Sequence, residues 1–298
     1  GFTAIPNTVV NIGKQGLTTP YTVATDINGN EQTGTGILAL SNVGPVTFGA
    51  GYFNNTNLDK SLEVNASQGW GLNDTGSVNG FNGGDDLYVA TVQGDLDFVK
   101  LEAWYAGLQE TFNSYTLAAT SNLDLAENAK LGLEARYVYL KLDSDLVGNV
   151  LERDNSMMRF AVDGKFSIVN ARLAYTKTDK DGGLTAFDQD AKNTSLGWAI
   201  TSNGVADADY FQAALGVDIL DNLNFTAHYG NLSSDLQTGR TVLLDDVKQQ
   251  EVYGQLTYKM SKNLSTYLRY GTYDEKINST GEKVQDQTRG RLQVAYTF

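Results

Sequence analysis

Arginine and glutamate side chains recur at every second position of several extended segments. In residues 130–142, Glu134 and Arg136 alternate with apolar residues, and in residues 98–107 Glu102 and Trp104 alternate in the same way. Successive side chains of a strand point to opposite faces, so each pair lies on one face. A row of charges needs water, because burial of an unpaired charge is costly. The spacing therefore predicts strands with one wet, charged face.

The polar rows supply the side chains that we expect to line a water-filled lumen. Guanidinium groups on one wall, opposite carboxylates, would produce a transverse field that orients dipolar solutes and tunes ion selectivity. Lys14 is the least regular member, because Val10 and Ile12 share its row; a bulge or a rim position would account for it. The predicted lining comprises Lys14, Asp26, Glu31, Glu102, Trp104, Glu134, Arg136, Arg159, Arg172, Arg269, Arg289 and Arg291.

The connecting segment 17–32 carries Asp26 and Glu31 but no Lys or Arg. We expect it to fold into the lumen as a constriction loop, where its carboxylates would lie opposite the arginines. With the net charge of −13, this arrangement predicts a preference for cations.

The same loop offers oxygen ligands for Ca²⁺ from Asp26, Asn28, Asn30 and Glu31 in a Gly-containing turn. Their spacing does not form a complete calcium loop, so carboxylates of the opposite wall would have to complete a site. The alternative is a hydrated acidic loop, and no other cofactor is expected.

Catalytic chemistry has little support in this sequence. There is no cysteine, and the only histidine, His228, falls in the middle of a strand on its wet face. No Gly-x-Ser-x-Gly motif is present. We therefore expect a protein that is not an enzyme, with His228 as a polar residue of the lumen wall. The acidic net charge also argues against a nucleic-acid partner.

Fourteen strand-like segments position these residues, and no segment has a helical apolar period. Short and long connections between the segments alternate strictly along the chain. A transmembrane barrel explains this alternation, because one end has short turns and the other has long loops. The predicted fold is an all-β, antiparallel, up-and-down barrel that occupies residues 1–298 as a single domain. The predicted strands are 8–16, 33–42, 46–54, 85–94, 98–107, 114–121, 130–142, 156–166, 169–178, 208–219, 223–231, 248–260, 264–274 and 286–298.

The terminal strand shows how the two faces are used. In "RLQVAYTF", Leu292, Val294 and Tyr296 form an apolar row, whereas Arg289 and Arg291 belong to the polar row. We assign the apolar row to lipid and the polar row to the lumen. A soluble all-β protein is the alternative, but its apolar faces would have to converge on one core, and the loop alternation would be unexplained.

Two stretches resemble a known family. "VVNIGKQGL" (9–17), a loop with the pair Thr25-Asp26, and "TGTGILAL" (33–40) are similar to the major outer membrane protein of Campylobacter and its relatives, and the terminal aromatic strand resembles those of bacterial outer-membrane proteins. The resemblance implies an 18-stranded porin that passes small hydrophilic solutes and is a homotrimer. It also implies contact with outer-membrane lipid and lipopolysaccharide, and extracellular long loops.

The strand count departs from that family. Four strands precede the Gly-Lys-Gln strand in the family, so the fourteen strands here lead us to expect that an N-terminal quarter is missing. A complete 14-stranded barrel is the alternative. A missing quarter would leave unpaired edges in lipid, so those strands would have to exist in the full molecule.

The sequence thus favours an outer-membrane porin for passive diffusion of ions and small hydrophilic solutes. One alternative is a surface adhesin or receptor, with a barrel as anchor and loops 55–84 and 179–207 as the binding surface. Another is a substrate-specific channel. Recordings in planar bilayers would separate a channel from a closed anchor.

Overall fold

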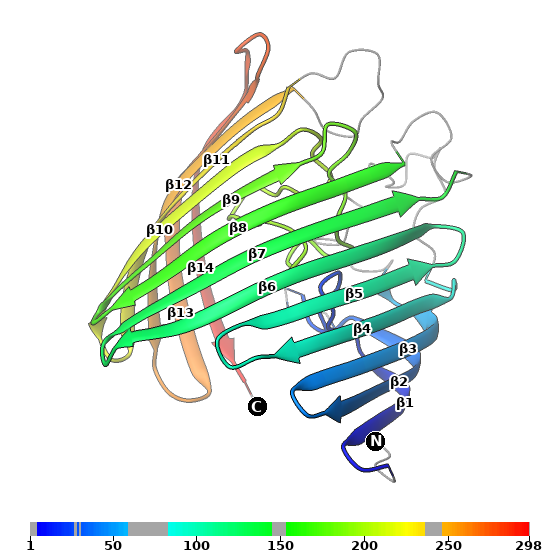
Figure 1. The fold of residues 1–298 in the computed structure, drawn as a ribbon. Coiled ribbons are helices and arrows are strands. Elements are labelled where there is room, and N and C mark those ends of the chain that lie inside the picture. Colours follow the sequence, from blue (N-terminus) through cyan, green and yellow to red (C-terminus); the bar gives the residue numbers. More distant parts are fainter. Residues whose placement is uncertain are drawn as a thin grey trace.

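The computed structural model describes residues 5–26, 29, 31–58, 83–144, 153–235 and 246–297. One antiparallel sheet contains all of the strands, and each strand pairs with its neighbours in the chain, in the order β1 to β14 (Figure 1). The strands are β1 (Thr8–Gly16), β2 (Thr33–Val43), β3 (Val46–Thr56), β4 (Leu87–Asp95), β5 (Lys100–Leu108), β6 (Phe112–Ala126), β7 (Ala129–Leu142), β8 (Asp154–Phe166), β9 (Val169–Thr178), β10 (Asp209–Leu220), β11 (Leu223–Ser233), β12 (Val247–Lys259), β13 (Leu264–Ile277) and β14 (Lys283–Tyr296).

This topology confirms the predicted all-β, antiparallel, up-and-down arrangement with fourteen strands. In the described part of the chain, β1 and β14 are the two edges of the sheet and do not pair with each other. The count of eighteen strands therefore remains a prediction. No described helix has the length and apolar character needed to cross a membrane.

The sheet curves so that one face is concave and the other convex (Figure 1). The convex face carries the apolar rows: Leu292 is 71% exposed and Val294 is 63% exposed. The concave face carries the charged rows, and Arg289 of β14 lies against Trp198 there. The period-2 pattern of the sequence thus separates the two faces of the sheet.

Lys14 is the exception among the predicted lumen residues. It pairs with Thr35 of β2, two positions from the pair Ile12–Ile37, and Ile12 is 77% exposed. Residues two apart in a strand share a face, so Lys14 belongs to the convex face and not to the lumen wall. The regular pairing of β1 with β2 includes no register shift that would turn it inward.

One predicted boundary was wrong by several residues. We expected a turn over 122–129, but β6 continues to Ala126, with Leu123 paired to Leu131. The polar residues Asn122 and Asp124 resemble loop residues in sequence. They alternate with leucines near the end of β6. The turn itself contains only residues 127 and 128.

The face assignment predicts the effect of a charge on the convex face. The change Val294→Arg places a cation on the apolar row, and we expect it to reduce the free energy of unfolding by about 2–4 kcal/mol near the membrane midplane and by less near the interface. Ala295→Arg, on the concave face of the same strand, is the control and should have little effect. Urea unfolding in lipid would measure both.

Because the chain has no cysteine, thiol labelling offers an independent check of this face assignment. A water-soluble reagent should label a cysteine that replaces Arg291 and spare one that replaces Val294. The opposite labelling pattern would contradict the register of β14.

Candidate functional site

The connection between β9 and β10, residues 179–207, lies along the concave face of the sheet. We call it the inner loop. Leu184 and Phe187 belong to a buried cluster with residues of β3 to β7, and Ile200 belongs to a second cluster with Tyr210 and Leu232. A loop that projected into solvent would not bury these apolar side chains. The inner loop is therefore part of the interior of the sheet.

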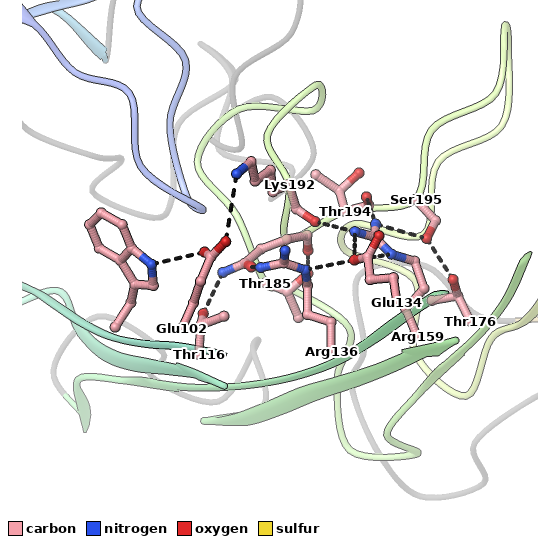
Figure 2. Close-up of polar contacts among 12 residues, drawn as sticks. Glu102, Thr116, Glu134, Arg136, Arg159, Thr176, Thr185, Lys192, Thr194 and Ser195 are labelled. Carbon is pink, nitrogen blue, oxygen red and sulfur yellow. Dashed lines mark hydrogen bonds and ion pairs between the residues drawn. The ribbon is translucent and has the colours of Figure 1, made fainter. Parts of the chain in front are cut away.

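Three arginines converge on one carboxylate beneath the inner loop, and Figure 2 shows two of them, Arg136 and Arg159. Glu134 accepts hydrogen bonds from Arg136 Nε at 3.0 Å and from Arg159 Nη2 at 2.6 Å, and Arg172 Nη2 lies 4.0 Å from its other oxygen. Arg136 and Arg159 are directly opposite each other on β7 and β8 and are 4% and 7% exposed. Two buried like charges at paired positions repel each other, so Glu134 is required between them.

The two buried arginines also hold the inner loop by its backbone. Arg159 donates to the carbonyl oxygens of Thr194 at 2.5 Å and Lys192 at 2.8 Å, and Arg136 donates to Asn193 Oδ1 at 3.3 Å. Figure 2 shows Thr194 and Ser195 of the loop beside Arg159, whereas the side chain of Lys192 points to Glu102. Arg159 thus donates from all three of its side-chain nitrogens to protein acceptors, and Arg136 donates from two of its three.

The segment 17–32 lies beside the inner loop. The carbonyl oxygen of Tyr21 accepts hydrogen bonds from the N–H groups of Phe187 and Asp188, and the Tyr21 hydroxyl accepts one from Thr116 of β6 at 3.0 Å. Tyr21 also stacks on Phe187, with ring centroids 5.8 Å apart. These contacts fix residues 17–23 between the inner loop and the wall.

Carboxylates gather where these two segments meet. Asp188 accepts a hydrogen bond from the N–H of Val23 at 3.0 Å, and Asp26 is 4% exposed. The pKa of Asp188 is raised to about 7, chiefly by burial and also by the nearby carboxylates of Asp190 and Asp26, against the hydrogen bonds that lower it.

The described residues do not form a calcium site around Asp26. They include no group of three or more His, Cys, Asp or Glu residues that could hold a metal ion. Glu31 is exposed, and Asn28 and Asn30 lie outside the described residues.

A second anchor holds the inner loop near β12 to β14. Glu251 accepts hydrogen bonds from the N–H groups of Trp198 at 3.0 Å and Ala199 at 2.7 Å. The Trp198 ring lies 5.3 Å from the guanidinium carbon of Arg269 and 5.4 Å from that of Arg289. Cation–π contacts of this kind are favourable, so Trp198 connects the loop to two strands at once.

The remaining predicted residues lie on the same concave face. Trp104 donates from its indole nitrogen to Glu102 at 3.1 Å, and Lys192 of the inner loop lies 4.0 Å from Glu102 (Figure 2). Arg291 pairs with Arg269 in the register of β13 and β14. Sequence reasoning did not single out Asn193 or Trp198. The apolar residues Leu184, Phe187 and Ile200 in an otherwise polar connection were the available signal that this loop is buried.

The arginine cluster predicts that neutralising two different carboxylates lowers the free energy of unfolding by different amounts. Glu134→Gln leaves Arg136 and Arg159 without their counter-charge, and we expect a loss of about 3–5 kcal/mol in the free energy of unfolding. Asp163→Asn breaks a 2.6 Å pair with Arg172 in which both side chains are almost half exposed, and it should cost less than about 1 kcal/mol. Urea titrations of both variants would test this order, and equal losses would contradict it.

The geometry can be compared with known proteins. The sequence pattern of the family described as Campylobacter major outer membrane protein matches residues 2–298. No curated protein sequence matches the chain.

Solved structures share the fold. OccAB3 of Acinetobacter baumannii is similar with a TM-score of 0.78 and 16% identity, over 98% of this chain and 75% of that chain. The outer membrane protein opdK of Pseudomonas aeruginosa has a TM-score of 0.75 and 16% identity, over 98% and 76% of the two chains. OpdL of Pseudomonas aeruginosa has a TM-score of 0.76 and 17% identity, over 97% and 78%. At these identities the likeness shows the fold alone.

The family match spans nearly the whole chain and agrees with the resemblance seen at residues 9–17 and 33–40. The protein is therefore an outer-membrane protein that belongs to the Campylobacter major outer membrane protein family.

Proposed function

We propose that this protein forms a water-filled channel for the passive diffusion of ions and small hydrophilic solutes across the bacterial outer membrane. The observation that carries the proposal is the pair of segments, residues 17–26 and the inner loop, which lie along the concave face of a sheet whose convex face is apolar. In our proposal these segments form a constriction, in which the charges of Glu134, Arg136 and Arg159 lie beside the apolar cluster that contains Phe187.

The charges in this interior favour cations in our proposal. Arg136, Arg159 and Arg172 are paired with Glu134 or Asp163, so two carboxylates offset part of the positive charge of these three residues. The carboxylates of Asp26 and Asp190 lie close enough to Asp188 to raise its pKa. The chain as a whole carries −13 charges. An acidic mouth raises the local concentration of cations.

The family resemblance also implies several partners, which we include in the proposal. We propose a homotrimer surrounded by outer-membrane lipid and lipopolysaccharide, with the long connections on the extracellular side. Calcium at Asp26, Asn28, Asn30 and Glu31 stays a prediction from the sequence.

An adhesin or receptor is a weaker candidate. Its binding surface would include residues 179–207. This segment, however, buries Leu184, Phe187 and Ile200 against the wall, and the N–H groups of Trp198 and Ala199 donate to Glu251. Most of the other loop, 55–84, lies outside the described residues. A substrate-specific channel is compatible with the same geometry.

Planar bilayers provide the test of the channel. We expect stepwise, ohmic conductance from the purified protein, and a reversal potential in a salt gradient that indicates cation preference. A closed anchor would give no conductance steps, and that result would exclude the channel.

The acidic loop can be tested in the same recordings. Asp26→Asn with Glu31→Gln removes two carboxylates, and we expect the reversal potential to shift toward anions. Asp97→Asn with Glu127→Gln makes the same charge change at the short turns and serves as the control. If the loop variant gives an unchanged reversal potential and conductance, residues 17–32 are not at the constriction.

A further inference from the structure

The arginines of the concave wall are stabilised in two different ways. On β7 and β8, Arg136 and Arg159 share the carboxylate of Glu134. Among the described residues, neither Arg269 of β13 nor Arg289 of β14 has a carboxylate within ion-pair distance. Two positive charges of the wall therefore have no counter-charge in direct contact.

Aromatic rings surround these two guanidinium groups instead. Trp198 is the ring that both share, with its centroid 5.3 Å from the guanidinium carbon of Arg269 and 5.4 Å from that of Arg289. The negative face of an aromatic ring offsets part of the field of a cation, and the ring also keeps ions away from that side. Three tyrosines of the wall complete this surround, at 5.0 Å, 5.1 Å and 6.0 Å from a guanidinium carbon: Tyr253, Tyr267 and Tyr273.

Trp198 differs from the three tyrosines because it belongs to the inner loop and not to the sheet. Its N–H donates to one oxygen of Glu251 at 3.0 Å, and the N–H of Ala199 donates to the other at 2.7 Å. The Trp198 ring packs edge-on against Tyr253, with centroids 5.4 Å apart and an angle of 68° between the planes. The position of the loop thus decides how much of the two guanidinium groups is covered.

Two glycines leave room for the carboxylate that holds this part of the loop. A Cβ atom at Gly197 of the inner loop would overlap with Glu251 Oε1, and one at Gly230 of β11 would lie 3.0 Å from Glu251 Cγ. Glu251 is only 3% exposed. Because the loop and β11 enclose its carboxylate from two sides, Glu251 holds the backbone at Trp198 and keeps the ring over the arginines.

The cover over these arginines has a consequence for permeating ions. A positive charge on a channel wall attracts anions and repels cations. Arg269 donates from Nε and Nη2 to Gln255 Oε1 at 2.9 Å and 2.6 Å, but this amide is neutral and does not offset the charge. The aromatic faces are therefore the groups in contact that reduce the pull of these arginines on anions.

We propose that Trp198 is a selectivity-determining residue of the channel, which weakens the attraction of Arg269 and Arg289 for anions and so supports the preference for cations. Glu251 is the positioning residue that holds Trp198 in place. This inference rests on the proposed channel function and deepens it, because it names the residue through which the inner loop acts on ion selectivity.

Reversal potentials in a KCl gradient across planar bilayers test the role of the ring. Trp198→Leu keeps a large apolar side chain and the backbone N–H to Glu251 but has no aromatic face. We expect the permeability ratio of K⁺ to Cl⁻ to fall about two- to fivefold. Trp198→Phe keeps an aromatic face and should retain most of the wild-type ratio. Tyr270→Leu removes a ring from the convex face of β13 and is the control, which should have no effect. An unchanged ratio in Trp198→Leu would overturn the proposal.

A second background separates this role from a purely structural one. Arg269→Gln with Arg289→Gln removes both charges, and in that background Trp198→Leu should leave the ratio unchanged, whatever happens to the conductance. An equal fall of the ratio in both backgrounds would overturn the proposal, because the ring would then act without the arginines. A protein without conductance steps contradicts the proposed channel itself. A protein that conducts with a ratio insensitive to Trp198→Leu contradicts only this inference.

Discussion

The compensation of two facing arginines by Glu134 is the interaction on which the interior depends. Arg136 and Arg159 occupy paired positions of β7 and β8 and are almost completely buried. Without a counter-charge, this pair would be strongly unfavourable. With Glu134 between them, their remaining donors are directed at the inner loop, which supplies Thr194 and Lys192 carbonyl oxygens. The buried charges are thus what holds a polar loop against a polar wall.

Aromatic residues supply the second part of this attachment. Tyr21, Phe187 and Phe112 form one contact chain from segment 17–32 through the inner loop to β6, with ring centroids 5.8 Å and 4.5 Å apart. Trp198 lies between Arg269 and Arg289 at the other end of the loop. Apolar and cation–π contacts therefore hold the loop at both ends, and the hydrogen bonds of the arginine cluster hold it in the middle.

The period of two made the strands predictable, because every strand has one apolar face. The predicted bounds of β1 and β9 agree with the structure, whereas β6 continued past its prediction because lumen residues such as Asn122 look like loop residues. The partners on the wall were predictable as a set, since Glu134, Arg136 and Arg159 share a polar face. Their convergence was not, because it depends on the register between strands. The path of the inner loop depends on contacts distant in sequence, which the local pattern does not contain.

The same register explains why the interior is open beside His228 and closed on the far side of Tyr253. There, Gly271 pairs with Tyr253, and a Cβ atom at Gly271 would lie 2.4 Å from Tyr253 Cβ and 2.2 Å from the carbonyl oxygen of Val252. Glycine is thus required for the backbone to approach, and Arg269 and Arg289 fill the space above it by packing on Tyr253 and Trp198. On the other side, Ala214 lines a cavity beneath the inner loop. Gly271 permits close packing of the wall, because side chains of adjacent rows cover it. Ala214 is not covered in this way and leaves a cavity.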